Sequence, residues 1–155
     1  MAPDTDVMSV LAPPSREPDF VIGPEDNPYL LRWHLLPRGE DDSSSLYYHI
    51  FLRDDDRALH DHPRESVSVL LSGQLREIYD DGGRVAGRLL LRGGLVKRAS
   101  ESAHRIEVVD GPAHTLFFVG PRVRNWGFHC PNGWAPWEQF LDPENKGAVG
   151  PGCGE

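Results

Sequence analysis

Two histidines one residue apart, His60 and His62, are the residues of this chain whose type and spacing best suit metal chemistry. The segment that follows them alternates β-branched and small residues and stops at Gly73, which is typical of a strand. Residues i and i+2 of an extended chain project to one face, with Cα atoms about 7 Å apart. The two imidazoles can therefore converge on one metal ion, and a third ligand must come from elsewhere in the chain.

The rest of the chain predicts the elements that must position this pair. It holds 16 glycines and 14 prolines among short apolar runs, which favours strands and turns over long helices. We expect strands over 29–36, 46–52, 67–71, 74–79, 84–91, 95–98, 103–109, 114–119, 122–129 and 134–141. About ten short strands at this spacing predict an all-β fold, an antiparallel sandwich or barrel whose mouth can hold a ligand.

The 155 residues suffice for one domain with one core. Residues 1–27 carry five prolines among acids and small residues, and we expect an irregular lead-in there. The barrel domain is expected over 28–142. Residues 143–155 are glycine-rich and predict a loose tail.

The composition disfavours several classes of partner. A net charge of −8 without basic clusters argues against nucleic acid, and no apolar run is long enough to predict a membrane span. The N-terminus lacks the pattern of a signal peptide, so a cytoplasmic location is expected. Cys130 and Cys153 are far apart in sequence and predict free thiols, with a disulfide between them as the alternative.

Over about residues 46–120 the chain resembles the cupin superfamily, whose fold is a double-stranded β-barrel, or jelly roll. His60 and His62 match the histidine pair of the first cupin motif, and Gly73 matches its closing glycine. Gly93 and His104 keep the register of the second motif. Other motif positions depart from the pattern and hold Asp54, Ser66, Ala99, Glu101 and Val108.

The resemblance implies one divalent transition metal held by His60, His62 and His104. Imidazoles suit Fe(II), Zn, Ni, Mn or Cu, and three ligands leave the open positions of a catalytic metal. Glu65, one residue before the cupin glutamate position, is a further candidate ligand. Strand alternation points it away from the metal unless Pro63 or a bulge resets the phase. Without Glu65 the ligand set is similar to that of thiol dioxygenases such as cysteine dioxygenase, which favours Fe(II).

Candidates for the pocket beside the metal are Tyr48, His49 and His114, which lie in expected strands. Tyr47 and Tyr48 project to opposite faces, so one of them should face the interior. The segment from Trp126 to Phe128 would line the barrel mouth or pack in the core. The chain is also similar to small single-domain cupins of bacteria and their phages, which share its acidic loop, its His-Asp-His-Pro segment and its Trp-Gly-Phe segment before Cys-Pro.

These features predict a metal-dependent enzyme that acts on a small molecule, with an Fe(II) oxidoreductase or dioxygenase favoured. The alternatives are a metal-dependent isomerase, lyase or hydrolase, and a non-catalytic cupin that binds a small molecule. The His-Asp-His segment can also be read as a polar turn without a metal. No segment resembles an attached DNA-binding domain, and the resemblance to cupins implies a homodimer.

Overall fold

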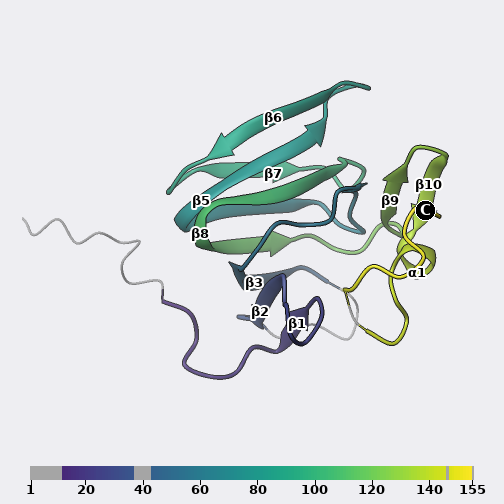
Figure 1. Cartoon of the computed structure of the whole chain (residues 1–155). Coiled ribbons are helices and arrows are strands. Elements are labelled where there is room, and N and C mark those ends of the chain that lie inside the picture. The colour runs from purple at the N-terminus through teal and green to yellow at the C-terminus, as the bar shows by residue number, and fades with distance from the viewer. Residues whose placement is uncertain (1–11, 37–42, 146, 155) are drawn as a thin grey trace, which may run out of the picture.

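A computed structural model describes residues 12–36, 43–145 and 147–154 of the chain (Figure 1). These residues form ten strands and one short helix, which are, in chain order, β1 (Phe20–Ile22), β2 (Leu30–His34), β3 (Ser45–Phe51), β4 (Leu59–His60), β5 (Ser66–Asp80), β6 (Val85–Leu90), β7 (Leu95–Arg98), β8 (His104–Val119), β9 (Gly127–Cys130), β10 (Gly133–Pro136) and α1 (Trp137–Phe140). Among them, no helix is long and apolar enough to cross a membrane.

The strands form one antiparallel sheet that curls into a half-barrel. Its order is β1-β2-β3-β8-β4-β9-β10, and β5 pairs with β8 while β6 and β7 pair with β5. Figure 1 shows β5 to β8 gathered above β1 to β3, with β9, β10 and α1 at one end. The all-β, antiparallel prediction is confirmed.

The two longest strands each join two segments that the sequence predicts as separate strands. β5 continues through Gly73, where the pairing register with β8 shifts. Gly73 has φ +79°, and a Cβ there would lie 2.7 Å from the Cα of Ala113. The glycine therefore permits a bulge and a close approach of two backbones, and it does not end the strand. The predicted last strand is instead divided into β10 and α1.

Alternation along β3 separates an inner face from an outer face of the sheet. Phe51 packs in the inner apolar cluster, while Tyr48 belongs to a second cluster with Trp33 and Leu71. The inner cluster comprises Leu30, Phe51, Leu70, Leu75, Leu90, Val96, Ile106 and Ala113, and all of these except Ala113 line the cavity of the half-barrel. Burial of this inner face fixes which residues of each strand meet inside the curl.

The described residues near both ends of the chain form more backbone pairing than the sequence predicts. Phe20–Ile22, inside the expected irregular lead-in, form β1 and pair with β2. Residues 1–11 of that lead-in lie outside the described residues. At the other end, the amides of Gly150 and Gly152 donate to the carbonyl of Phe140, and Leu141 bridges to Val149. The tail is therefore held against α1 and is not loose.

A disulfide joins Cys130 of β9 to Cys153 of the tail, with their Cα atoms 5.5 Å apart. The prediction of free thiols is wrong in this structure. The two cysteines are 23 positions apart in the sequence, and the segment between them includes β10 and α1, which turn the chain back on itself. Sequence spacing does not reveal such a return, because it depends on how the elements between the cysteines fold.

Replacement of both cysteines by serine should destabilise the protein. The bond closes a loop of 23 residues, and closing a loop of this length removes denatured-state entropy worth about 3 kcal/mol. For a domain of this size we expect the melting temperature to fall by about 10 °C. Thermal and urea unfolding without reductant measure the change. Wild-type protein in dithiothreitol should behave like the double variant, and equal stability of oxidised wild type and variant would contradict the expectation.

Candidate metal centre

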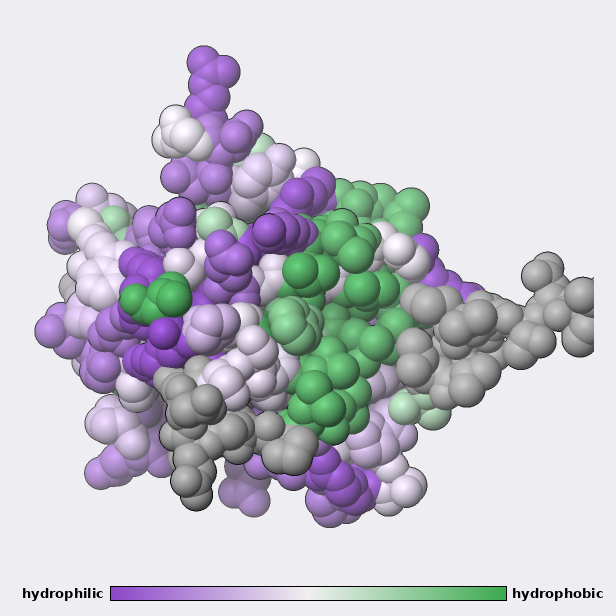
Figure 2. All heavy atoms as spheres, turned by 180° about the vertical axis from the view of Figure 1, so that it is seen from behind, coloured by the Kyte–Doolittle hydropathy of each residue, from purple (hydrophilic) through white to green (hydrophobic). Residues whose placement is uncertain are grey.

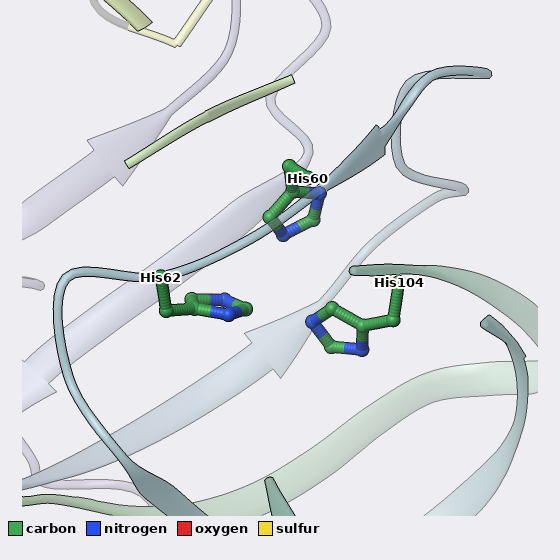
Figure 3. Close-up of side chains that lie close together, drawn as sticks. All are labelled: His60, His62 and His104. Atoms are coloured by element: carbon green, nitrogen blue, oxygen red, sulfur yellow. The ribbon is translucent and has the colours of Figure 1, made fainter. Parts of the chain in front are cut away.

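Three histidines from two neighbouring parts of the sheet converge inside the curl (Figure 3). His60 ends β4, His62 follows it by two residues, and His104 begins β8 directly opposite His60 in the pairing register. The ring centroids of each pair lie 4.9 to 5.0 Å apart. One nitrogen from each ring lies within 4.8 Å of the other two. The structure therefore brings together the three residues that the cupin motifs single out.

The spacing of these nitrogens suits one shared ion. Three atoms no more than 4.8 Å apart have a common point within about 2.8 Å of each. Inward movement of each ring by about 0.7 Å would reach the usual metal–imidazole bond of about 2.0–2.1 Å. Small side-chain rotations provide a shift of this size without any change in the backbone.

The pKa values of His62 and His104 also fit a metal. Burial lowers the pKa of His104 to about 3, although its hydrogen bond with Glu77 opposes this shift. Burial, followed by the neighbouring His104 and His60, holds the pKa of His62 well below its usual value. Nδ1 of His60 and of His62 are buried without a hydrogen-bond partner among the described residues. Neutral, underbonded imidazoles are the ligand form that transition metals bind.

Glu77 orients the ring of His104. Its side chain is 1% exposed, and Oε1 lies 2.6 Å from Nδ1 of His104 and 2.5 Å from Nε of Arg98. Nε of Arg88 donates to Oε2 at 2.6 Å. Burial alone would raise the pKa of Glu77, but the bond to His104 and the charge of Arg98 outweigh it and lower the pKa.

An ionised carboxylate only accepts hydrogen bonds, so Nδ1 of His104 carries the proton that it shares with Glu77. The lone pair of His104 is therefore on Nε2, which is available to a metal. A carboxylate behind a ligating histidine fixes the ring and raises its basicity. Glu77 is not among the sequence-predicted site residues; it stands two residues before Tyr79, the cross-strand partner of His104.

A second buried carboxylate, that of Asp55, lies beside His60. Its Oδ2 lies 3.3 Å from Nδ1 of His60, in contact but without a hydrogen bond between them. Burial raises the pKa of Asp55, and the nearby His60 opposes this effect. Asp54 to Asp56 form an acidic run that suggests a solvated turn. Asp55 departs from that interpretation because it turns inward beside the histidines.

Asp61, between His60 and His62, anchors this segment to the β9–β10 hairpin. It is 1% exposed and accepts hydrogen bonds from the Gly127 amide, Nε1 of Trp134 and Nε2 of His129. Arg124 lies 2.9 Å from its Oδ1. Because residue i+1 of an extended segment projects opposite to residues i and i+2, this anchor holds both imidazoles toward the cavity.

Glu65 stays outside the centre. It is exposed, whereas its neighbours Arg64 and Ser66 are buried, and the cluster of metal-type ligands comprises the three histidines alone among the described residues. The structure thus contradicts Glu65 as a fourth ligand. Strand alternation explains this placement, because neither Pro63 nor a bulge resets the phase of the chain before β5.

The three pocket candidates are divided between the two faces of the sheet. His49 lines the cavity together with Tyr47, so Tyr47 is the tyrosine of this strand that faces inward. Tyr48 and His114 lie on the outer face, where the Tyr48 hydroxyl and Nδ1 of His114 are 2.7 Å apart. These two candidates are therefore wrong. Residues 48 and 49 are adjacent in one strand and cannot both point inward.

The histidines open into a cavity of about 770 Å³. Trp126 lines it, lies 6.3 Å from the ring of His60 and stacks on Trp137 at 5.9 Å. Phe128 lies 5.8 Å from His60 and stacks on Phe140. The aromatic segment therefore both packs in the core and forms a wall of the site, which joins the two interpretations of the sequence.

Comparison with known proteins gives structural matches without a sequence match. No family model and no curated protein matches the sequence. The structure matches Fe(II)-HppE with the alternative substrate (S)-1-HPP at a TM-score of 0.55 and 18% identity, over 71% of this chain and 58% of that chain. It matches DMSP lyase DddQ from Ruegeria pomeroyi DSS-3 at a TM-score of 0.52 and 21% identity, over 68% and 54%.

Oxalate decarboxylase from Bacillus subtilis matches at a TM-score of 0.52 and 16% identity, over 72% of this chain and 28% of that chain. The chain spans less than two thirds of the length of each of these proteins. At these identities the likeness carries the fold and no reaction. The three matched proteins are cupins, and the curled antiparallel sheet of this chain is a cupin-like fold.

Proposed function

We propose that the protein is a metal-dependent cupin enzyme that acts on a small molecule, with His60, His62 and His104 as the metal ligands. The observation that carries this proposal is the convergence of three imidazoles, that of His104 buried and those of His60 and His62 partly buried, in one cavity of about 770 Å³. A bound transition metal would supply a Lewis-acid or redox centre with open coordination positions.

We favour Fe(II) and an oxidoreductase or dioxygenase reaction. The described ligand cluster contains no carboxylate. Iron is one of the transition metals that imidazole ligands suit. The side chains of the centre would hold the ion, and Glu77 would keep the ring of His104 in the binding tautomer. The apolar walls would exclude bulk water and orient the substrate toward the open side of the centre.

Metal analysis followed by oxygen uptake tests this version. Protein expressed in defined medium is assayed for bound metals, then stripped and reloaded with Fe(II) without oxygen. We expect one iron per chain and oxygen consumption with a member of a panel of thiols and small organic acids. Absence of iron binding, or no uptake with any member of the panel, would contradict it.

A second candidate is a metal-dependent lyase, isomerase or hydrolase. The matched structures include a lyase and a decarboxylase by name, alongside Fe(II)-HppE. Turnover with Zn or Mn in the absence of oxygen would favour this class. Tight binding of a small molecule without turnover under any metal would instead identify a non-catalytic binding protein.

We also propose a homodimer. The outer face of the sheet carries Leu31, Ile50, Val69 and Leu116, all partly exposed around a buried aromatic cluster. Figure 2 shows hydrophobic residues gathered over one area of the side seen from behind. Sedimentation equilibrium should give twice the chain mass of 17.3 kDa, and a monomer mass would contradict the proposal.

The cytoplasmic location stays a prediction. The state of the Cys130–Cys153 disulfide in cells tests it, because such bonds are rare in a reducing cytosol.

A further inference from the structure

The three consecutive aspartates that precede β4, residues 54–56, are fixed to β8. Oδ1 of Asp54 accepts a hydrogen bond from the amide of Val108 at 2.8 Å. The amide of Asp55 donates to the carbonyl of Ile106, also at 2.8 Å. Both partners belong to β8, the strand that supplies the third histidine of the centre. The acidic run is therefore held against the metal centre, although its charge suggests a solvated turn.

Asp56 turns the chain from this run into β4. Its Oδ1 accepts a hydrogen bond from the amide of Ala58 at 2.9 Å, and its own amide donates to Oδ1 of Asp55 at 2.8 Å. Aspartate oxygens that accept from an amide one or two residues further along the chain hold a tight turn in place. This turn fixes one oxygen of Asp55 and brings the other, Oδ2, beside the ring of His60.

Oδ2 of Asp55 and Nδ1 of His60 are two buried polar atoms that face each other without a hydrogen bond. They lie 3.3 Å apart, and their side chains are 11% and 13% exposed. Neither atom has a hydrogen-bond partner among the described residues. Buried polar atoms are seldom left unpaired, because an unmade hydrogen bond destabilises the fold. A small rotation of the imidazole would pair these two atoms with each other.

The second nitrogen of His60 lies on the side of the other two histidines. Figure 3 shows one nitrogen of this ring turned toward His62 and His104, and the other turned away from them. Nδ1 is the nitrogen beside Asp55, so Nε2 is the nitrogen toward the centre. A neutral imidazole carries one proton and one lone pair on its two nitrogens. The position of that proton therefore decides whether His60 presents a lone pair or a hydrogen to an ion.

We propose that Asp55 is a positioning residue, which holds the proton of His60 on Nδ1 and so presents the lone pair of Nε2 to the metal. This inference deepens the proposed function and rests on it for the presence of a metal. A carboxylate that accepts the Nδ1–H hydrogen bond fixes both the tautomer and the orientation of a ligating ring. Glu77 supports His104 in the same way from β5. Two of the three ligands would then be oriented by carboxylates from different parts of the chain.

The position of the proton is tested first on the wild-type protein. The full chain, isotope-labelled at the histidine nitrogens, is observed by NMR in metal-free and Zn-loaded form, at a pH where imidazole is neutral. The signals of His60 are identified by their absence from the spectrum of His60→Gln. We expect the proton on Nδ1 in both forms and zinc on Nε2 in the loaded form. A proton mainly on Nε2 in either form, or zinc bound to Nδ1, would contradict the inference.

Asp55→Leu removes the acceptor and keeps a side chain of similar length. We expect His60 in this metal-free variant to shift toward the Nε2–H tautomer, which an isolated histidine side chain prefers. Zinc affinity, measured by competition with a chromogenic chelator, should fall about tenfold to a hundredfold. Asp55→Asn keeps one acceptor oxygen and should fall between wild type and Asp55→Leu, and it serves if the leucine variant does not fold. Asp54→Asn is the matched control, because it removes a charge from the same run and keeps the acceptor for the Val108 amide. This control should bind zinc as wild type does.

An unchanged tautomer of His60 in both Asp55 variants would overturn the inference even if zinc affinity falls, because Asp55 would then act only through its charge or the fold. An equal loss of affinity in Asp54→Asn would have the same meaning. The metal-free spectra separate the two proposals. A chain that takes up no metal, but whose His60 loses the Nδ1 proton in Asp55→Leu, would refute the proposed function and support the role of Asp55. A chain that binds zinc through Nδ1 of His60 would do the reverse.

Discussion

We expect His104→Ala to abolish stoichiometric metal binding at the proposed centre. Each of the three histidines offers one ligand atom to the proposed centre, and His104 is the one that comes from a distant part of the chain. Metal sites with protein ligands draw on the order of 10 kcal/mol from their ligands together, so loss of one of three should weaken affinity by about a few hundredfold. Elemental analysis of the purified variant, and competition with a chromogenic chelator, measure the loss.

His114→Ala is the matched control for this result. It removes an imidazole from the same strand, β8, but on the outer face, where His114 contacts Tyr48. This control should keep its metal. His104→Gln retains a polar side chain beside Glu77, and it replaces the alanine variant in the test if that variant does not fold. Full metal content in a folded His104 variant would refute the three-histidine centre.

Glu77→Gln should weaken both the fold and the metal site. The carboxylate accepts hydrogen bonds from Arg98, Arg88 and His104, and its neutral replacement leaves the Arg98 charge buried at 4% exposure. Removing one partner from a buried ion pair typically costs about 3–5 kcal/mol of folding free energy. Loss of the carboxylate behind a ligating histidine typically lowers metal affinity about tenfold to a hundredfold.

The two effects of Glu77→Gln are measured separately. Urea unfolding of metal-free protein reports the folding free energy, and chelator competition reports metal affinity in the folded variant. Glu107→Gln supplies the comparison, because Glu107 pairs with Arg76 and Arg105 of the same sheet while partly exposed, and such pairs contribute less than about 1 kcal/mol. If the Glu77 and Glu107 variants lose the same small amount of stability, the buried network does not have the role assigned to it.

The sequence predicts the sheet well because its signals are local. Alternation of apolar and polar residues, with turn residues between, marks most strands near their observed positions. The errors fall where long-range pairing decides. Gly73 has the residue type of a strand end, yet β8 continues alongside and converts the position into a bulge. The same reason explains Cys130 and Cys153, whose proximity depends on the fold of the chain between them.

The sequence predicts those residues of the centre that lie close together in one strand or match a known motif. His60 and His62 follow from strand geometry, and His104 follows from the cupin register. Glu77 and Asp55 are not predicted from the sequence, because the role of a carboxylate depends on the side chain that lies beside it in the folded sheet. For Glu77 that neighbour is set by the pairing of β5 with β8, which neither segment reveals by itself. Parity within one strand does suffice to exclude Tyr48 once His49 points inward.

The disulfide has a consequence for how this protein is handled at the bench. Leu141, Asp142 and Val149 form part of the cavity wall, and the covalent link from Cys153 to β9 holds their segment in place. A thiol offered as substrate is also a reductant. At millimolar concentration it can reduce the Cys130–Cys153 bond and so loosen this part of the cavity wall during the assay. Assays with thiols therefore need the serine double variant run in parallel, so that turnover is distinguished from loosening of the wall.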